Sequence, residues 1–216
     1  MEERLVRNQE ATGSNPAFST RSLKTCNRFA CFSFCSDMEY TDIVNNMKTL
    51  RETERLLLIP IDDEIIDALL ESDESFNHTF GLINNGGEYL NPFPGYLLKI
   101  RERLLDCPQE YPLAVDQLIV LKESGTVIGT IYFKSLPVNG TSEIGYGINK
   151  PYRSKGYASE ALQAMLSYGR ENGISRVIAD TMPDNLASQK VLRRNGFTLK
   201  EKRNGKLLFT LNNDPH

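Results

Sequence analysis

Between Glu143 and Leu162 the sequence runs from a strand through a short turn into a helix, and no other segment constrains the fold as strongly. Residues 142–148 form the predicted strand. Residues 159–172 form a predicted helix whose apolar face includes Leu162 and Leu166. Strands and helices that alternate in this way pack together as layers around one core. The segment therefore predicts an α/β domain.

The turn in this segment, Arg153-x-x-Gly156-x-Ala158, has the composition of an anion-binding site. The first N–H groups of a helix have no partner within the helix and carry a partial positive charge. Gly156 lets the backbone approach a phosphate closely, and Ala158 leaves the start of the helix uncrowded. Arg153 and Lys155 add cationic charge. We expect this turn to bind a pyrophosphate.

Two other phosphate-binding motifs do not fit this segment. A Walker loop requires Gly-Lys followed by Ser or Thr, and the segment has no Gly-Lys. A Rossmann fingerprint requires three glycines directly after the first strand. Gly145 and Gly147 supply only two, and they lie inside the predicted strand. An ordinary strand-to-helix turn remains the alternative for the isolated pattern.

The other elements complete a mixed sheet with helices on both faces. Predicted strands occupy residues 56–59, 117–121, 127–133, 176–180, 197–202 and 206–211. Predicted helices follow Asp62, span residues 95–105, and follow Asp184 or Asn185. From Ser72 to Gly95 the helix and strand signals are mixed.

Composition disfavours several classes of function. The 25 Lys and Arg residues against 28 Asp and Glu residues give a net charge of -3, so no basic excess favours nucleic-acid binding. No apolar run approaches the ~20 residues that span a bilayer, so we expect no membrane association. Cys26, Cys31 and Cys35 lack a fourth ligand at zinc-site spacing. We expect no metal, and a cytoplasmic protein with reduced thiols.

Residues 1–46 show no sustained helical or strand period and differ from the rest. Residues 7–16 resemble peptides translated from a transfer-RNA gene. The residues that follow Met47 resemble the natural start of a protein. We therefore predict that residues 1–46 are a disordered or non-native extension, and that one domain spans residues 47–216 and natively begins at Met47 or Met38. A signal peptide around residues 29–35 is the alternative, although no Ala-x-Ala site follows.

Three motifs in their order along the chain resemble the GNAT superfamily of N-acetyltransferases: Arg153-x-x-Gly156-x-Ala158, Asn185-x-x-Ser188 and Asn195-Gly196-Phe197. The RimJ/RimL-like branch, which acetylates ribosomal-protein N-termini, is the most similar, since residues 53–58 and 157–162 also fit it. The resemblance covers residues 47–211 and is loose between Ser72 and Pro112. It implies the GNAT fold, a mixed, mostly antiparallel central sheet flanked by helices, with splayed strands forming the acyl-CoA cleft.

The resemblance also implies which residues bind acetyl-CoA as a cosubstrate. The pantetheine arm would lie beside the splayed strand and pair with backbone groups near Gly147 and Ile148, one N–H polarising the thioester carbonyl. Asn185 and Ser188 would face the arm near its sulfur. The pyrophosphate would bind the turn formed by Arg153, Ser154, Lys155, Gly156, Tyr157, Ala158 and Ser159. A β-bulge at the glycines, and a helix cap at Asn185, are the alternatives.

The implied reaction is a direct attack of an amine on the thioester, without a covalent enzyme intermediate. Glu143 is the candidate base, acting through water, and Ser188 the candidate proton donor to the departing thiolate. Their alternatives are a solvated strand end and a polar surface residue. We expect Glu160 to make local hydrogen bonds and to compensate the helix charge.

The implied activity is N-acyl transfer from acetyl-CoA to a primary amine, either a protein N-terminus or a small molecule. A catalytically silent acyl-CoA-binding sensor or scaffold is the alternative function. The variable residues 72–112 and the C-terminal hairpin would select the acceptor. The protein could act as a monomer or a homodimer.

Overall fold

The computed structural model describes residues 48–87, 94–108 and 111–212. The prediction for residues 1–46, and the three cysteines within them, lie outside the described residues. In chain order the elements are β1 (Arg51–Glu52), β2 (Leu56–Pro60), α2 (Asp63–Glu71), α3 (Asp73–Phe80), α4 (Pro94–Asp106), β3 (Gln117–Leu121), β4 (Thr126–Phe133), β5 (Thr141–Ile148), the 3-10 helix η2 (Lys150–Tyr152), α5 (Tyr157–Glu171), β6 (Arg176–Thr181), α6 (Leu186–Arg194), β7 (Thr198–Arg203) and β8 (Lys206–Asn212).

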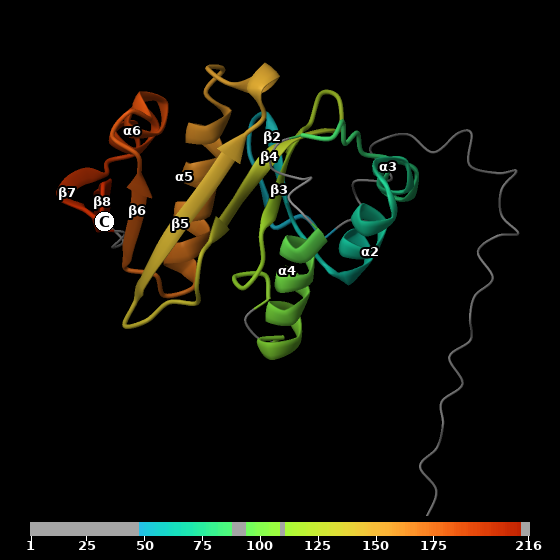
Figure 1. Ribbon diagram of the computed structural model, residues 1–216, viewed down its shortest axis with the longest axis horizontal. Coiled ribbons are helices and arrows are strands. Elements are labelled where there is room, and N and C mark those ends of the chain that lie inside the picture. The colour runs from blue at the N-terminus through green and yellow to red at the C-terminus, as the bar shows by residue number, and fades with distance from the viewer. Residues whose placement is uncertain (1–47, 88–93, 109–110, 213–216) are drawn as a thin grey trace, which may run out of the picture. The chain divides into compact units, whose positions relative to one another are not determined.

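The strands form one sheet in the order β1-β2-β3-β4-β5-β6-β8-β7 (Figure 1). Every neighbouring pair is antiparallel except β5 and β6, which run parallel. The α5 crossover connects these two parallel strands, as a parallel pair requires. The expected mixed, mostly antiparallel sheet with flanking helices is confirmed.

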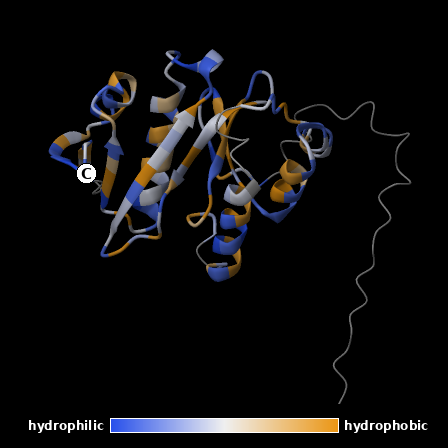
Figure 2. Cartoon of the chain, viewed as in Figure 1, coloured by the Kyte–Doolittle hydropathy of each residue, from blue (hydrophilic) through white to orange (hydrophobic). Residues whose placement is uncertain are grey.

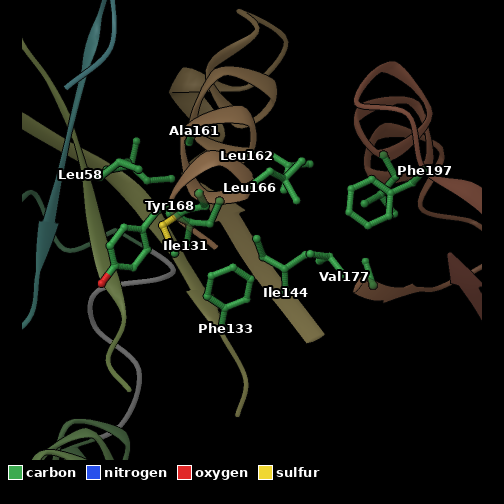
Figure 3. Close-up of a cluster of buried hydrophobic side chains, with 14 of the residues drawn as sticks. Leu58, Ile131, Phe133, Ile144, Ala161, Leu162, Leu166, Tyr168, Val177 and Phe197 are labelled. Atoms are coloured by element: carbon green, nitrogen blue, oxygen red, sulfur yellow. The ribbon is translucent and has the colours of Figure 1, made fainter. Parts of the chain in front are cut away.

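Alternating side chains of the central strands fill two separate cores. On one face Leu58 joins a cluster with Leu162 and Leu166 of α5, which meet the sheet in Figure 3, and with Leu192 of α6. On the other face Leu57 joins a cluster with α2, α3 and α4. The continuous apolar run at residues 56–59 thus reflects a strand buried on both faces.

The N-terminal half differs most from expectation. Helix α3 was not predicted, because among its residues only Phe76 is buried and the apolar signal is weak. Ser72 caps both sides of the break, ending α2 and accepting a hydrogen bond from Ser75 N at the start of α3. Pro60 is the last residue of β2, one position beyond the predicted strand. It is tolerated because β1 pairs only with Leu57 and Leu58.

The C-terminal half follows the predicted elements within about two residues, which is the usual spread of helix and strand boundaries. The turn at Asn204 and Gly205 has φ angles of 51° and 76°, as a two-residue hairpin requires. Helix α5 starts at Tyr157, two residues before the predicted Ser159. Within the described ranges, no helix is both long enough and apolar enough to cross a membrane.

Candidate active site

The turn between β5 and α5 has an unusual backbone. Ser154 and Gly156 adopt positive φ angles of 64° and 88°, on either side of Lys155. Gly156 is the N-cap of α5 and supplies no side chain to satisfy the first N–H groups of the helix. In Figure 2 the segment between β5 and α5 is coloured blue and white, whereas orange recurs along parts of the strands.

Consecutive backbone amides of this turn have no hydrogen-bond acceptor. Among the described residues, nothing accepts from the N–H groups of residues 154–158, whereas the next two, Ser159 and Glu160, donate to Gly156 O. A run of amides with alternating left-handed residues forms a concave anion site, and the positive end of a helix adds to it. The turn predicted for pyrophosphate binding therefore has the backbone that such a ligand requires.

The side chains of the turn are held by their surroundings. Arg153 Nε donates to the carbonyl oxygen of Ile148 at 2.7 Å, which ties the turn to the end of β5. The Lys155 ammonium lies 5.7 Å from the ring centre of Tyr152. Ser159 Oγ accepts a hydrogen bond of 2.8 Å from Asn195 Nδ2, so its own proton is available to a ligand.

Strands β5 and β6 pair only at their beginnings. Residues 141–143 pair with residues 176–178, and beyond Glu143 and Ile178 the two strands diverge (Figure 1). From there β5 pairs with β4 alone, and β6 with β8 alone. The resulting open edge of β5 ends at the turn, as expected for splayed strands.

Backbone direction decides which groups face this open edge. In an antiparallel strand, successive residues direct their N–H and C=O groups to opposite sides. Glu143 O accepts from Lys134 N, and Asn149 N donates to Ile128 O, so the odd-numbered residues of β5, Gly147 included, face β4. Tyr146 and Ile148 therefore direct their backbone groups to the open side. The Ile148 carbonyl is occupied by Arg153, which leaves the Ile148 N–H available.

The glycines of β5 do not form a bulge. The β4–β5 pairing runs without a register shift from Ile144 to Ile148. At Gly145 a Cβ atom would lie 2.9 Å from Cζ of Tyr132, so the packed tyrosine ring leaves no room for a side chain. Gly145 is thus explained by the Tyr132 side chain on the neighbouring strand.

The start of α6 faces the open edge. Asn185 caps this helix, its Oδ1 accepting from Ser188 N at 3.0 Å. Ser188 Oγ lies 3.0 Å from the hydroxyl of Tyr146, which reaches across from β5. Burial raises the pKa of Tyr146, so the phenol keeps its proton. Tyr146 was not among the predicted site residues. The alternation of Ile144, Tyr146 and Ile148 nevertheless places all three on the face of the sheet that α5 covers.

Glu143 lies on the opposite face of the sheet, at the point where the pairing of β5 with β6 ends. It pairs with Lys134 at the end of β4. Lys134 also pairs with Asp180 at 2.9 Å, and Lys206 pairs with the other Asp180 oxygen at 2.5 Å. These four side chains, from β5, β6, β8 and the residue that follows β4, balance two negative charges with two positive ones.

The hydrogen bonds of this cluster shift the pKa values of Asp180 and Lys134. Burial opposes ionisation of Asp180, but hydrogen bonds from Lys206 and Lys134 outweigh it and lower the pKa of Asp180 to about 2. Burial likewise disfavours the Lys134 ammonium, but hydrogen bonds to Glu143 and Asp180 raise its pKa. Asp180 and Lys134 therefore both stay ionised near neutral pH.

Two further observations concern cavities and metals. A cleft of about 610 Å³ lies along α5, lined on its other side by residues 51–55, and it reaches Gly156. Within the described ranges, no group of three or more His, Cys, Asp or Glu side chains is placed to hold a metal ion. Cys107 is a free thiol.

Comparison with known proteins gives a consistent result. The profile of the acetyltransferase (GNAT) domain matches residues 55–198. An uncharacterised N-acetyltransferase of Bacillus subtilis (strain 168), YjdG, is 34% identical over 157 residues, which cover 71% of this chain and 92% of that protein. The ribosomal-protein-serine acetyltransferase of Escherichia coli (strain K12) is 33% identical over 86 residues, which cover 39% of this chain and 48% of that protein.

A solved structure shares the fold. RimL, a ribosomal L7/L12 alpha-N-protein acetyltransferase in complex with coenzyme A, superimposes with a TM-score of 0.57 at 23% sequence identity. The match covers 76% of this chain and 98% of that chain. The overall fold is therefore one that a protein solved in complex with coenzyme A also adopts.

Proposed function

The chain belongs to the GNAT acetyltransferase family, and from that premise we propose that it moves an acetyl group from acetyl-CoA to a primary amine by direct attack. The observation that carries the proposal is the run of unpaired amides at residues 154–158, placed where the open edge of β5 ends. This pairing of an anion site with an unpaired strand edge fits a ligand that has a diphosphate and an extended amide-bearing arm. We take residues 47–216 as the acetyltransferase domain, since the matched residues 55–198 lie inside it.

The proposed cosubstrate supplies an activated acyl group as a thioester, and the protein's residues hold and polarise it. The turn formed by Arg153, Ser154, Lys155, Gly156, Tyr157, Ala158 and Ser159 holds the diphosphate. The free backbone groups of Tyr146 and Ile148 pair with the arm. In this geometry the Ile148 N–H, rather than the Gly147 N–H, is directed toward the thioester carbonyl.

The proposed proton transfers use both faces of the sheet. Glu143 accepts the proton of the attacking amine through water on one face. Ser188 donates a proton to the departing thiolate on the other face, and Tyr146, 3.0 Å from Ser188 Oγ, holds that hydroxyl in place. Asn185 fixes the start of α6 through its cap and so positions Ser188. Because the proposed acid and base lie on opposite faces of the sheet, the amine can approach the thioester without displacing the pantetheine arm.

The relatives favour a protein acceptor. One is named for acetylating a serine of a ribosomal protein, and RimL for acetylating an alpha-amino group. We therefore propose a protein N-terminal amine as the acceptor, with a small-molecule amine as the competing substrate class.

Measuring free thiol released from acetyl-CoA tests the function. The acceptors are N-terminal peptides beginning with Ser or Ala, polyamines, aminoglycosides and amino acids. Turnover with the peptides is the expected result. Binding of coenzyme A without turnover on any acceptor would support a silent acyl-CoA sensor instead, and absence of binding would reject the site.

A further inference from the structure

The turn proposed to hold the diphosphate is contacted by a segment about a hundred residues earlier in the sequence. Residues 53–55 join β1 to β2 and lie against the start of α5. Neither strand carries a predicted site residue. These residues nevertheless contact the turn, and together with Gly156 they line the 610 Å³ cleft.

Glu160 in the first turn of α5 makes the hydrogen bonds expected of it, but its partners come from this distant segment. Its Oε1 accepts from Thr53 Oγ1 at 2.6 Å and from Arg55 N at 2.9 Å. Its Oε2 accepts from Arg55 Nε at 2.8 Å. Burial opposes its ionisation, yet these bonds lower the pKa of Glu160. The ionised carboxylate therefore fixes the Arg55 guanidinium in one orientation.

Arg55, once oriented, contacts the turn itself. Its Nη1 donates to the carbonyl oxygen of Lys155 at 3.1 Å. Its guanidinium lies 4.6 Å from the ring centre of Tyr157, the first residue of α5. A Cβ atom at Gly156 would lie 3.4 Å from Nη2. Three successive residues of the turn thus border one guanidinium.

The contact with Lys155 O determines where an amide points. The Lys155–Gly156 peptide is trans, so its C=O and N–H groups point in opposite directions. By holding the carbonyl of Lys155, Arg55 directs the Gly156 N–H, one of the unpaired amides of residues 154–158, away from itself.

The charge of Arg55 is already balanced. Glu160 Oε2 lies 2.6 Å from Nη2, so the guanidinium and the carboxylate form a neutral pair. A neutral pair contributes little to the attraction of an anion, whereas a fixed carbonyl pre-organises the amides that bind it.

We propose that Arg55, held by Glu160 and Thr53, is a positioning residue that keeps the turn at residues 153–159 in its anion-binding conformation. The inference rests on the proposed coenzyme A site and adds to it a residue outside the turn. It assigns to the opening segment of the domain a role in cosubstrate affinity, and none in the chemical step.

Arg55→Gln tests the proposal, with coenzyme A affinity measured by calorimetry and with kcat and KM for acetyl-CoA. The loss of one hydrogen bond to a charged donor predicts an affinity about tenfold weaker and a correspondingly higher KM. kcat at saturating acetyl-CoA stays within about twofold of the wild type, because Arg55 touches no reacting atom. Arg51→Gln is the matched control. Arg51 borders the same cleft but pairs with Glu171 at the far end of α5, so its loss leaves affinity unchanged.

Arg55→Lys distinguishes an effect of the guanidinium's orientation from an effect of its positive charge. A lysine retains the charge but has no planar fork to bridge Glu160 and Lys155 O, so affinity stays as weak as in Arg55→Gln. In Arg55→Lys the salt dependence of binding matches that of the wild type, because the charge beside Glu160 is retained and no contact with phosphate is lost. Restored affinity in Arg55→Lys would overturn the proposal in favour of a direct contact between the positive charge and phosphate.

The outcomes also distinguish this inference from the proposed function. If the wild type binds coenzyme A and Arg55→Gln binds it equally well, only the role of Arg55 is rejected. If the wild type does not bind coenzyme A, the proposed function fails and the inference fails with it. Should Arg55→Gln not fold, Glu160→Gln carries the same test, since it frees the guanidinium while leaving Arg55 in place.

Discussion

The two ends of β5 balance charge in different ways. At its beginning, Glu143 joins Lys134, Asp180 and Lys206 in a cluster in which every charge has a side-chain partner. At its end, the backbone amides of residues 154–158 have no acceptor within the described part of the chain, and the Lys155 ammonium contacts only a ring.

Because of this difference, we propose different roles for the two ends of β5. Unpaired amides at a helix start attract an anion, and no nearby carboxylate of the turn competes for them. A balanced cluster attracts neither sign strongly, but it can exchange a proton or accept a cationic amine if one partner moves. We therefore place the anionic part of the cosubstrate at the end of β5 and the amine at its beginning.

The largest expected effect comes from placing a carboxylate at the anion end. Gly156→Glu adds a side chain at a φ of 88° and a negative charge among the free amides. We expect coenzyme A affinity to fall at least about a hundredfold by calorimetry, since the charge repels the diphosphate. Gly173→Glu is the matched control, with a similar φ of 80° and open space around its Cβ position. Equal binding by both variants would remove the anion site from the turn.

The next effect concerns the base at the other end. Glu143→Gln removes the proposed base, and turnover near neutral pH is expected to fall about a hundredfold, as is typical of general-base catalysis. The deficit shrinks at high pH, where the amine loses its proton unaided. A pH–rate profile measures both. Asp180→Asn loosens Lys134 without removing the base, so its activity stays within about threefold; an equal loss in both variants would assign the effect to the cluster instead.

A smaller effect is expected for Tyr146, which reaches from β5 to Ser188 on α6. Tyr146→Phe removes the hydroxyl that holds Ser188, and kcat falls about tenfold with KM for acetyl-CoA unchanged. Combining it with Ser188→Ala yields no further loss, because both changes remove the same interaction. The control is Tyr168→Phe, which removes a hydroxyl near the C-terminal end of α5. Fully additive losses in the double variant would show that Tyr146 and Ser188 act independently.

The smallest effect is on stability. Because the pKa of Asp180 is lowered to about 2, the folded protein binds this proton less tightly than the unfolded chain does. The stability that Asp180 contributes is therefore complete above about pH 4 and is lost as the pH falls toward 2. Urea unfolding should show Asp180→Asn less stable than the wild type by under about 1 kcal/mol at pH 7, and by roughly a third of that difference at pH 2.5. In Asp184→Asn, whose side chain has no ion pair in the described chain, no such difference is expected; a constant deficit across pH would contradict the ion-pair explanation.

The C-terminal half of the fold could be predicted closely from the sequence. The strand, turn and helix at residues 141–171, the helix capped by Asn185 and the hairpin at Asn204 and Gly205 are all where their local patterns indicated. Each signal lies within about twenty residues and reflects backbone conformation or a cap, which neighbouring residues largely decide. Helix α3 was missed for the opposite reason, because tertiary packing of Phe76 rather than periodicity stabilises it.

For the candidate site, the sequence by itself determined the anion-binding turn, since glycine, small residues and a helix start are consecutive in the chain. Only the tertiary structure decided that β5 separates from β6 beyond Glu143, that the Ile148 N–H rather than the Gly147 N–H faces the open edge, and that Tyr146 reaches Ser188. It alone also brings Arg55 to the carbonyl of Lys155, a hundred positions later. The physical reason is distance along the chain: a turn is stabilised by bonds among its own residues, whereas pairing, edge direction and long-range contacts depend on where the whole sheet places each strand.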